Sequence, residues 1–321
     1  MPMTLKALSF TLSAALIAFV LSVFSPTASG QSLFVASVGD GRLHQFTLGG
    51  APLSTSDVGV NALTDVAVSG DSLFATSVSG YVAEYTMANS LINSTLFVPS
   101  LEDRNPYGIA ADASNLYVTT FGPSGAGDGA VGEYTSAGSV VNASLITGLT
   151  GPIGIAIDGD DLFVSSYALG TISEYTTSGT LINASLISGL NGPYYMAISG
   201  GNLYVTESGN GTVGEFTTSG ATINPSLISG LQYPTGIAVF GNDLFVGSYD
   251  LGTIGEYTTT GAVVNAALIS GLDRPYGMVV VAPEPSTLSL VVAGFGLAVL
   301  FGASCRCRRT RRISETFPQG S

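Results

Sequence analysis

Cysteine and positively charged residues are scarce in this sequence of 321 residues. The two cysteines, Cys305 and Cys307, lie near the C-terminus, so the preceding chain has neither disulfides nor thiol chemistry. Residues 31–282 contain no lysine, and their three arginines stand against twenty acidic residues, a net charge near −17. Nucleic-acid binding is excluded as a function because phosphate neutralisation needs clustered Lys and Arg. A surface this acidic keeps a protein soluble and attracts cations.

The N-terminal segment has the pattern of a secretory signal peptide. Lys6 precedes the apolar residues 7–23, and Pro26 and the small residues Ala28-Ser29-Gly30 follow. We expect residues 1–30 to be removed by signal peptidase, which leaves Gln31 as the new N-terminus.

The C-terminal segment combines a proline-rich motif, an apolar run and a basic cluster. The motif is Pro283-Glu284-Pro285-Ser286, and the apolar run covers residues 288–305. At 1.5 Å per residue this run is about 27 Å long as a helix, the lower limit for crossing a bilayer. Arginines beside a span remain in the cytoplasm, so the bulk of the chain is expected to face outward. The cluster consists of Arg306, Arg308, Arg309, Arg311 and Arg312.

Residues 283–312 resemble the PEP-CTERM sorting signal of Gram-negative bacteria, which has the same three parts in the same order. The resemblance implies recognition by a membrane-embedded exosortase-type protease, cleavage near the motif, and transfer to the cell surface or the extracellular polysaccharide matrix. Residues 313–321 extend beyond the usual end of such tails and are expected to form a short cytoplasmic tail. The alternative is two ordinary membrane spans, one at each end of the chain.

The part between these ends is a repeat array. The tripeptide Leu-[Phe/Tyr]-[Val/Ala] recurs at intervals of 40, 43, 46, 41 and 41 residues. It begins at Leu33, Leu73, Leu116, Leu162, Leu203 and Leu244. This period, with short β-branched and aromatic runs between turn residues, indicates a β-propeller. The fourth unit predicts strands at 154–157, 162–166, 171–176 and 180–187, so the six units predict six four-stranded blades.

The chain ends predict how the ring closes. Strands equivalent to 154–157 of the fourth unit are called the first type, and those equivalent to 162–166 the second type. The mature sequence begins at Leu33 with a strand of the second type, and it ends at 276–281 with an extra strand of the first type. We expect the spare strand to complete the first blade, which removes the unpaired edges of an open ring. The fold class is therefore all-β, a closed six-bladed propeller over residues 31–282.

Residues repeated in every unit are interpreted as structural. Six equivalent positions around a ring cannot form one active site, so each side chain is expected to make local contacts in its own blade. The repeated glutamates are Glu84, Glu133, Glu174, Glu215 and Glu256, and the repeated asparagines are Asn93, Asn142, Asn183, Asn224 and Asn265. Pro106, Pro152, Pro193, Pro234 and Pro275 are expected at the start of the inner strands, where proline is tolerated.

Candidate ligand-binding residues are those that break the pattern. Asp65 replaces the glycine of other units (Gly108, Gly154, Gly236 and Gly277), and Glu207 replaces a Ser or Thr. Asp250 lies in the loop after a second-type strand. The other candidates are tyrosines near the start of the inner strands: Tyr107, Tyr194, Tyr233 and Tyr276. Tyr195 directly follows Tyr194. Their rings either stack against sugars or fill the gaps between blades.

The units resemble NHL-type propellers. Their signature appears as Pro-Thr-Gly-Ile-Ala-Val at 234–239, followed by Asn-Asp-Leu-Phe-Val at 242–246. The resemblance specifies fold more than activity. Its relatives include calcium-dependent lactonases and a streptogramin lyase. A lyase would need a catalytic histidine, and the sole histidine is His44; a lactonase would need carboxylates and an asparagine around Ca2+.

Two functional hypotheses follow. The first is a non-enzymatic surface or matrix protein, without cofactor, whose propeller binds exopolysaccharide or other matrix proteins. The alternative is a divalent-cation-dependent lactonase or lyase in which Asp65, Glu207 and Asp250 contribute to a Ca2+ site. In either case the propeller, residues 31–282, is expected outside the cytoplasm. The C-terminal helix is expected to hold it at the inner membrane until processing.

Overall fold

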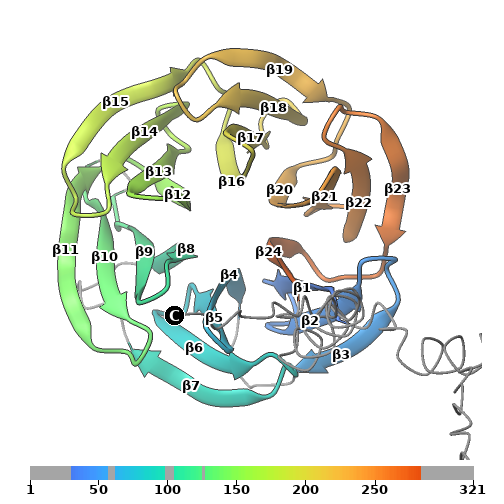
Figure 1. Ribbon diagram of the computed structural model, residues 1–321, viewed down its shortest axis with the longest axis horizontal. Helices are drawn as coiled ribbons and strands as arrows, with labels where there is room; N and C mark the ends of the chain where they lie inside the picture. The colour runs from blue at the N-terminus through green and yellow to red at the C-terminus, as the bar shows by residue number, and fades with distance from the viewer. Residues whose placement is uncertain (1–29, 57–61, 98–104, 125–126, 283–321) are drawn as a thin grey trace, which may run out of the picture. The chain divides into compact units, whose positions relative to one another are not determined.

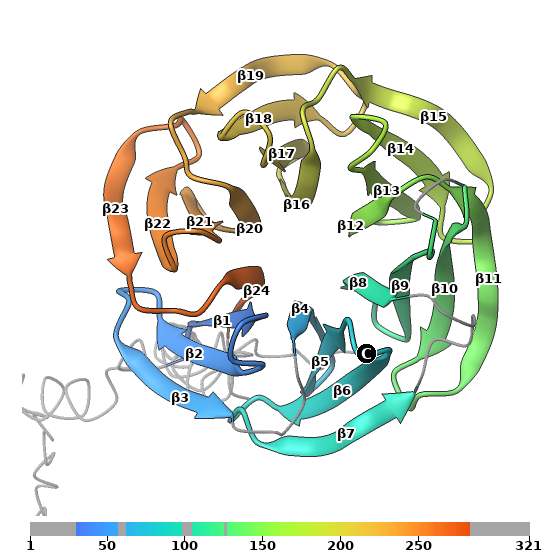
Figure 2. The ribbon, with the colours of Figure 1, turned by 180° about the vertical axis from the view of Figure 1, so that it is seen from behind.

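Four-stranded antiparallel sheets radiate from a central axis in this computed structural model (Figures 1 and 2). The structure describes residues 30–56, 62–97, 105–124 and 127–282, and within them it has six sheets and no helix. The described residues therefore form an all-β six-bladed propeller, which confirms the predicted architecture of residues 31–282. The predicted sorting segment 283–312, the tail 313–321 and the predicted signal peptide up to residue 29 lie outside the described residues. None of the described residues form a helix that could span a membrane.

Each of the first three blades has four strands, given in order from the axis outward. Blade 1 consists of β24 (Pro275–Val281), β1 (Ser32–Ser37), β2 (Leu43–Thr47) and β3 (Pro52–Ser56). Blade 2 consists of β4 (Leu63–Ser69), β5 (Ser72–Ser77), β6 (Tyr81–Thr86) and β7 (Leu91–Phe97). Blade 3 consists of β8 (Asn105–Ala111), β9 (Asn115–Phe121), β10 (Gly129–Thr135) and β11 (Val140–Leu149). Only blade 1 combines strands from both ends of the ring.

The remaining blades repeat this arrangement. Blade 4 consists of β12 (Pro152–Asp158), β13 (Asp161–Ser166), β14 (Thr171–Thr176) and β15 (Leu181–Ser188). Blade 5 consists of β16 (Pro193–Ser199), β17 (Asn202–Glu207), β18 (Thr212–Thr217) and β19 (Thr222–Ile228). Blade 6 consists of β20 (Pro234–Phe240), β21 (Asp243–Ser248), β22 (Thr253–Thr258) and β23 (Val263–Ile269). The strands predicted for the fourth unit match β12 to β15 within two residues at each end.

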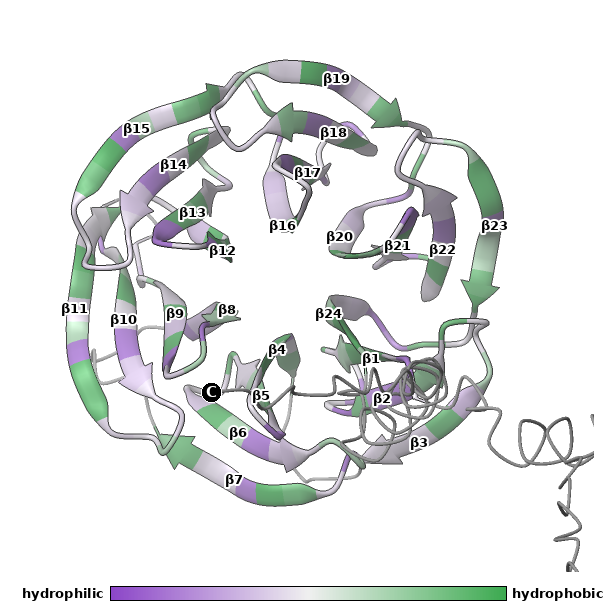
Figure 3. Ribbon diagram, in the orientation of Figure 1, coloured by the Kyte–Doolittle hydropathy of each residue, from purple (hydrophilic) through white to green (hydrophobic). Residues whose placement is uncertain are grey.

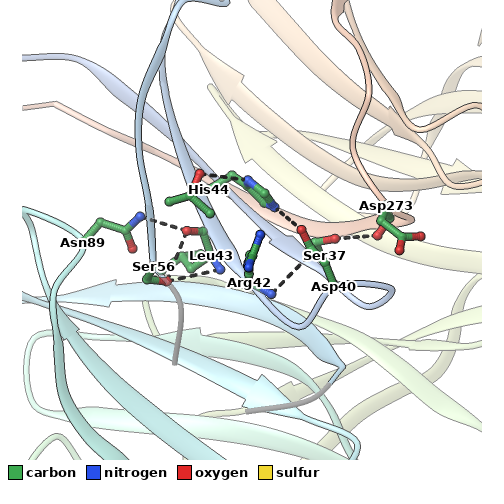
Figure 4. A network of polar contacts seen from close by, with 9 residues as sticks. Ser37, Asp40, Arg42, Leu43, His44, Ser56, Asn89 and Asp273 are labelled. Atoms are coloured by element: carbon green, nitrogen blue, oxygen red, sulfur yellow. Dashed lines mark hydrogen bonds and ion pairs between the residues drawn. The ribbon is translucent and has the colours of Figure 1, made fainter. Parts of the chain in front are cut away.

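The ring closes where the first and last described strands meet. β24 pairs antiparallel with β1, with Ser32 opposite Val281 and Val35 opposite Met278. Beyond the strands, the Val38 amide donates to the Arg274 carbonyl at 3.1 Å. The Ser37 hydroxyl donates to the Asp273 carbonyl at the same seam (Figure 4). The predicted closure is therefore confirmed.

The hydrophobic core lies between neighbouring blades. One cluster joins Phe163 and Ile172 of blade 4 to Leu203, Val205 and Phe216 of blade 5, all less than 5% exposed. Similar clusters join the other blades. Full burial of one such side chain contributes about 1.5–3 kcal/mol. Because each blade buries its faces against its neighbours, the blades depend on one another for stability.

Hydroxyl groups of the second strands tie blades 2, 3, 4 and 5 each to the next blade in the ring. Thr76 donates to the carbonyl of Tyr107, and Thr119 to that of Ile153, both at 2.6 Å. Ser165 and Thr206 make the same bond to the next blade at 2.7 and 2.6 Å. These bonds fix the inner strands, and thus the residues at the axis, in a common register.

Close approach at the axis explains the inner-strand glycines. A Cβ added to Gly236 would lie 1.8 Å from the carbonyl oxygen of Tyr276, and one added to Gly154 would lie 2.4 Å from that of Tyr194. Both carbonyls belong to the inner strand of the next blade, so a side chain would force the strands apart. The two units that carry a larger residue at this position are therefore exceptional.

Candidate functional site

The repeated polar residues make local contacts. Glu84 accepts a hydrogen bond from the Ser72 hydroxyl, and Glu133 and Glu215 accept one from an asparagine amide of the same blade, all at 2.8 Å. Each repeated asparagine accepts a hydrogen bond from the backbone amide two residues later, at 3.0–3.2 Å. These contacts agree with the structural interpretation of the repeated residues.

One end of the ring carries a cluster of aromatic rings, and this end is called the tyrosine face. The inner strands begin here, and the loops between second and third strands lie beside them. The centroid of Tyr194 lies 5.4 Å from that of Tyr276 and 6.1 Å from that of Tyr233, both edge to face. Tyr249 extends the cluster, 5.5 Å from Tyr233 and 5.8 Å from Tyr276. Tyr167 also packs against Tyr194, with a centroid distance of 5.7 Å.

The centre of the cluster is buried. Tyr194 and Tyr276 are 6% and 7% exposed, and their hydroxyls are hydrogen bonded to each other. Burial raises the pKa of both phenols, and the neighbouring phenol contributes further to the raised pKa of Tyr194. These two candidate residues therefore close the axis at this face instead of standing on its rim. Tyr107 and Tyr233 are half-buried and reach further toward solvent.

Tyr195 crosses the axis beneath this cluster. It occupies the glycine position of blade 5, and its hydroxyl donates to the carbonyl of Thr64 at 2.8 Å. Thr64 lies in blade 2, on the opposite side of the ring (Figure 1). The exception to the glycine pattern in blade 5 therefore joins two opposite blades.

Asp65 is the other exception, and it lies beside a central cavity. The cavity has a volume of about 240 Å3 and is lined by all six inner strands, largely by aliphatic side chains such as Ile155 and Ile237. Asp65 is 6% exposed and accepts hydrogen bonds from the amides of Val66 at 2.9 Å and Ile109 at 3.0 Å. Burial raises the pKa of its carboxyl to about 8, although these two hydrogen bonds oppose the shift.

Glu207 has a local structural environment. It is 4% exposed and accepts a hydrogen bond from the amide of Asn191 at 2.8 Å, and the side chains of Asn210 and Thr212 are also close. In other blades a serine at this position, such as Ser248, bonds to the preceding loop by donating to a carbonyl. Glu207 thus makes the equivalent loop connection with donor and acceptor exchanged.

Asp250 lines a hollow on the tyrosine face. The hollow has a volume of about 350 Å3 and lies between the β21–β22 loop of blade 6 and the segment leading into β24. Tyr249 and Asp250 line one side, and Asp273 and Arg274 line the other. The Arg274 guanidinium lies 5.8 Å from the centroid of the Tyr249 ring. An aromatic ring, two carboxylates and a guanidinium therefore surround one solvent-accessible space.

His44 lies away from the axis. It is on β2, the third strand of blade 1, and its imidazole bonds to Asp40 at 3.0 Å and to the Thr55 hydroxyl at 3.3 Å (Figure 4). Burial lowers its pKa, and the charge of Asp40 opposes this. The histidine therefore belongs to a local network of blade 1.

The predicted site residues fall into separate groups. Tyr194, Tyr233 and Tyr276 do converge, whereas Asp65, Glu207 and Asp250 belong to three different blades, 2, 5 and 6. No group of three His, Cys, Asp or Glu suited to a metal ion occurs in the described part of the chain.

Two members of the aromatic cluster, Tyr167 and Tyr249, were not predicted from the sequence. Each directly follows the serine that ends a second strand, Ser166 in β13 or Ser248 in β21. This shared position in two units was the signal that could have identified them.

No protein-family model matches this sequence, and no curated protein matches it. Solved structures do resemble the fold. A chain from the crystal structure of a nidogen/laminin complex has a TM-score of 0.64 and 17% identity, covering 79% of this chain and 99% of that one. A catalytically inactive virginiamycin B lyase from Staphylococcus aureus, crystallised with quinupristin, has a TM-score of 0.50 and 17% identity, covering 75% and 86%. At these identities the likeness shows the propeller fold alone.

Proposed function

We propose that this protein is an exported surface or matrix protein of a Gram-negative bacterium, and that its propeller is a non-enzymatic scaffold that binds polysaccharide on the tyrosine face. The hollow beside Tyr249 carries the proposal. Sugar rings bind where an aromatic face supplies apolar contact and polar groups accept or donate hydrogen bonds. Tyr249, Asp250, Asp273 and Arg274 offer these groups around one space of about 350 Å3.

The neighbouring tyrosines would extend such a site. Tyr167 is 41% exposed and contacts Tyr194, and the half-buried Tyr233 lies between Tyr194 and Tyr249. A row of rings that continues from the hollow suits a chain of sugars better than a single small molecule. The cation-dependent alternative draws no support from Asp65, Glu207 and Asp250, which lie apart, and we do not propose it.

Binding can be tested with the purified protein and the polysaccharide of the producing cells. We expect retention on immobilised polysaccharide at low salt, and a loss of about tenfold in affinity for Tyr249→Ala and for Arg274→Ala, because each removes one wall of the hollow. Asp160→Ala is the matched control, since it removes an exposed side chain from a turn at the opposite face of the ring, remote from the hollow. Absence of retention, or equal loss in the control, would contradict the proposed site.

The export route is proposed from the two terminal segments and has its own test. Signal peptidase and an exosortase-type protease are the expected processing partners. Intact mass and terminal sequencing of the protein from envelope and medium should give a chain that runs from Gln31 to about Pro285. A product that retains the arginine cluster in both fractions would contradict processing at the C-terminal motif.

A further inference from the structure

The six outermost strands form a cylindrical surface, which we name the outer wall. It consists of β3, β7, β11, β15, β19 and β23, and Figure 1 shows them as the outer rim of the ring. Not one of these strands contains Asp, Glu, Lys, Arg or His. In a chain with 22 acidic residues the exclusion of charge from every outer strand is a distinct feature of the molecule.

Large apolar side chains are exposed at the same position of each outer strand. β15 begins with Leu181 and Ile182, which are 52% and 50% exposed, and β23 begins with Val263 and Val264, which are 63% and 54% exposed. The equivalent side chains of the other outer strands are Leu53, Leu91, Ile92, Val140, Val141 and Ile223, each at least 38% exposed. Figure 3 shows hydrophobic segments along the rim. Exposed apolar area that recurs in this way marks an interaction surface.

The acidic residues lie elsewhere. Loops of the tyrosine face carry Asp40, Asp250 and Asp273, and the turns at the opposite face carry others, including Asp158 and Asp160. Two copies of so acidic a ring repel each other when their faces approach. Contact through the outer walls brings the uncharged outer strands together and keeps these loop and turn carboxylates at the two faces, in water.

We infer that the outer wall is a self-association surface through which rings of this chain pack side by side. A second copy is the occupant that fits both observations, because its own wall is equally apolar and equally uncharged. The equivalent wall segments are spaced around the ring, so one copy can contact several neighbours. Such contacts generate an extended layer in place of a closed dimer.

The contact is one between side chains and not an addition of strands. Each repeated asparagine of the outer strands, such as Asn183, already holds a backbone amide of its own strand, which for Asn183 is that of Ser185 at 3.0 Å. The register of β14 with β15 also shifts at this point. Pairing with a strand of another copy would break these bonds within the outer strand. The exposed side chains of Ile182 and its equivalents can pack against a neighbouring wall without breaking them.

The size of the wall sets the strength of each contact. β15 has eight residues and is roughly 26 Å long, so one wall-to-wall contact buries on the order of several hundred Å2. A stable interface buries about 1,200–2,000 Å2. Single contacts are therefore weak, and association depends on high concentration or on several contacts per ring.

Sedimentation velocity tests the inference on the full chain in detergent and on residues 30–282, which contain every described strand and close on themselves. We expect the sedimentation coefficient to rise with protein concentration, and to rise more in about 500 mM than in about 20 mM NaCl, because salt screens the repulsion between acidic rings. The wall variant carries Ile92→Thr, Val141→Thr, Ile182→Thr, Ile223→Thr and Val264→Thr. Threonine preserves strand propensity and net charge.

This variant should lose the rise, with an unchanged circular dichroism spectrum. The control Leu169→Thr/Leu251→Thr removes side chains that are 62% and 61% exposed in loops of the tyrosine face, and it should associate like the original protein. The inference is overturned if the original protein stays monomeric at about 1 mM in both salts, or if the wall variant associates as strongly as the control. A monomeric protein whose wall variant loses polysaccharide retention would assign the wall to polysaccharide and also overturn it.

Discussion

At the scale of single residues, the two departures from glycine on the inner strands, Asp65 and Tyr195, each connect parts of the ring that the glycines do not. Asp65 places a carboxyl where a Cβ on the adjacent Gly277 would lie 2.0 Å from its Oδ1 atom, so the glycine of blade 1 makes room for the acid of blade 2. The carboxyl is buried and has a raised pKa, which makes its neutral form the more stable one in the folded protein at pH 7.

The stability of the protein should therefore depend on pH through Asp65. The pKa of this carboxyl is about 8 in the folded protein and ordinarily 3.8, so the folded state holds a proton that the unfolded state releases between these values. The free energy of unfolding should fall as pH rises from about 4 to about 8, by up to about 5 kcal/mol. Urea denaturation at several pH values should show a smaller fall for Asp65→Asn. Parallel curves for the two proteins would contradict the assignment.

Comparison of the repeats predicts which residues are structural, but it does not predict what a residue that breaks the pattern does. The repeated glutamates and asparagines were recognised as structural because each occurs in nearly every unit. The same comparison singled out Asp65 and Glu207, but it could not tell a buried hydrogen-bonded carboxylate from a ligand. Burial and partners depend on which loop lies against the residue, and the loop that holds Glu207 through the Asn191 amide is not apparent from the repeats.

At the scale of elements, strands were predictable because their pattern is local. Each strand of blade 4 was located within two residues, and the spare strand after the last complete unit predicted the closure of blade 1. The aromatic cluster was only partly predictable. Tyr194 and Tyr276 are separated by 82 residues and meet because their inner strands begin at the same end of the ring.

Removal of β24 should be far more damaging than its length suggests. A chain that ends at Asp273 loses the inner strand of blade 1, exposes β1, and removes Met278 from the cluster between blades 6 and 1. We expect this truncation to lower the melting temperature by more than about 10 °C, or to prevent folding, because several buried contacts are lost together. Thermal unfolding followed by circular dichroism measures this. A melting temperature unchanged from that of the full ring would contradict the role of β24 in closure.

At the scale of the whole molecule, the ring is complete before the predicted sorting motif begins. The compact unit ends at Val281, where β24 makes its last pairing with β1. Cleavage just after Ala282 should therefore leave the melting temperature within about 1 °C of that of the chain cut near Pro285. A larger decrease would show that residues beyond 282 support the ring. The truncation at Asp273 is the internal reference for a damaging loss.

The hydrogen bond from Tyr195 to Thr64 gives the ring a mechanical property. A ring of blades can flatten into an ellipse by small rotations at each junction, without breaking the pairing inside any sheet. The Tyr195 side chain and its hydrogen bond of 2.8 Å together connect blade 5 to blade 2 across the axis. This connection resists lengthening of the diameter that joins these two blades. We therefore expect the ring to resist lengthening along the line through these two blades more than lengthening across it.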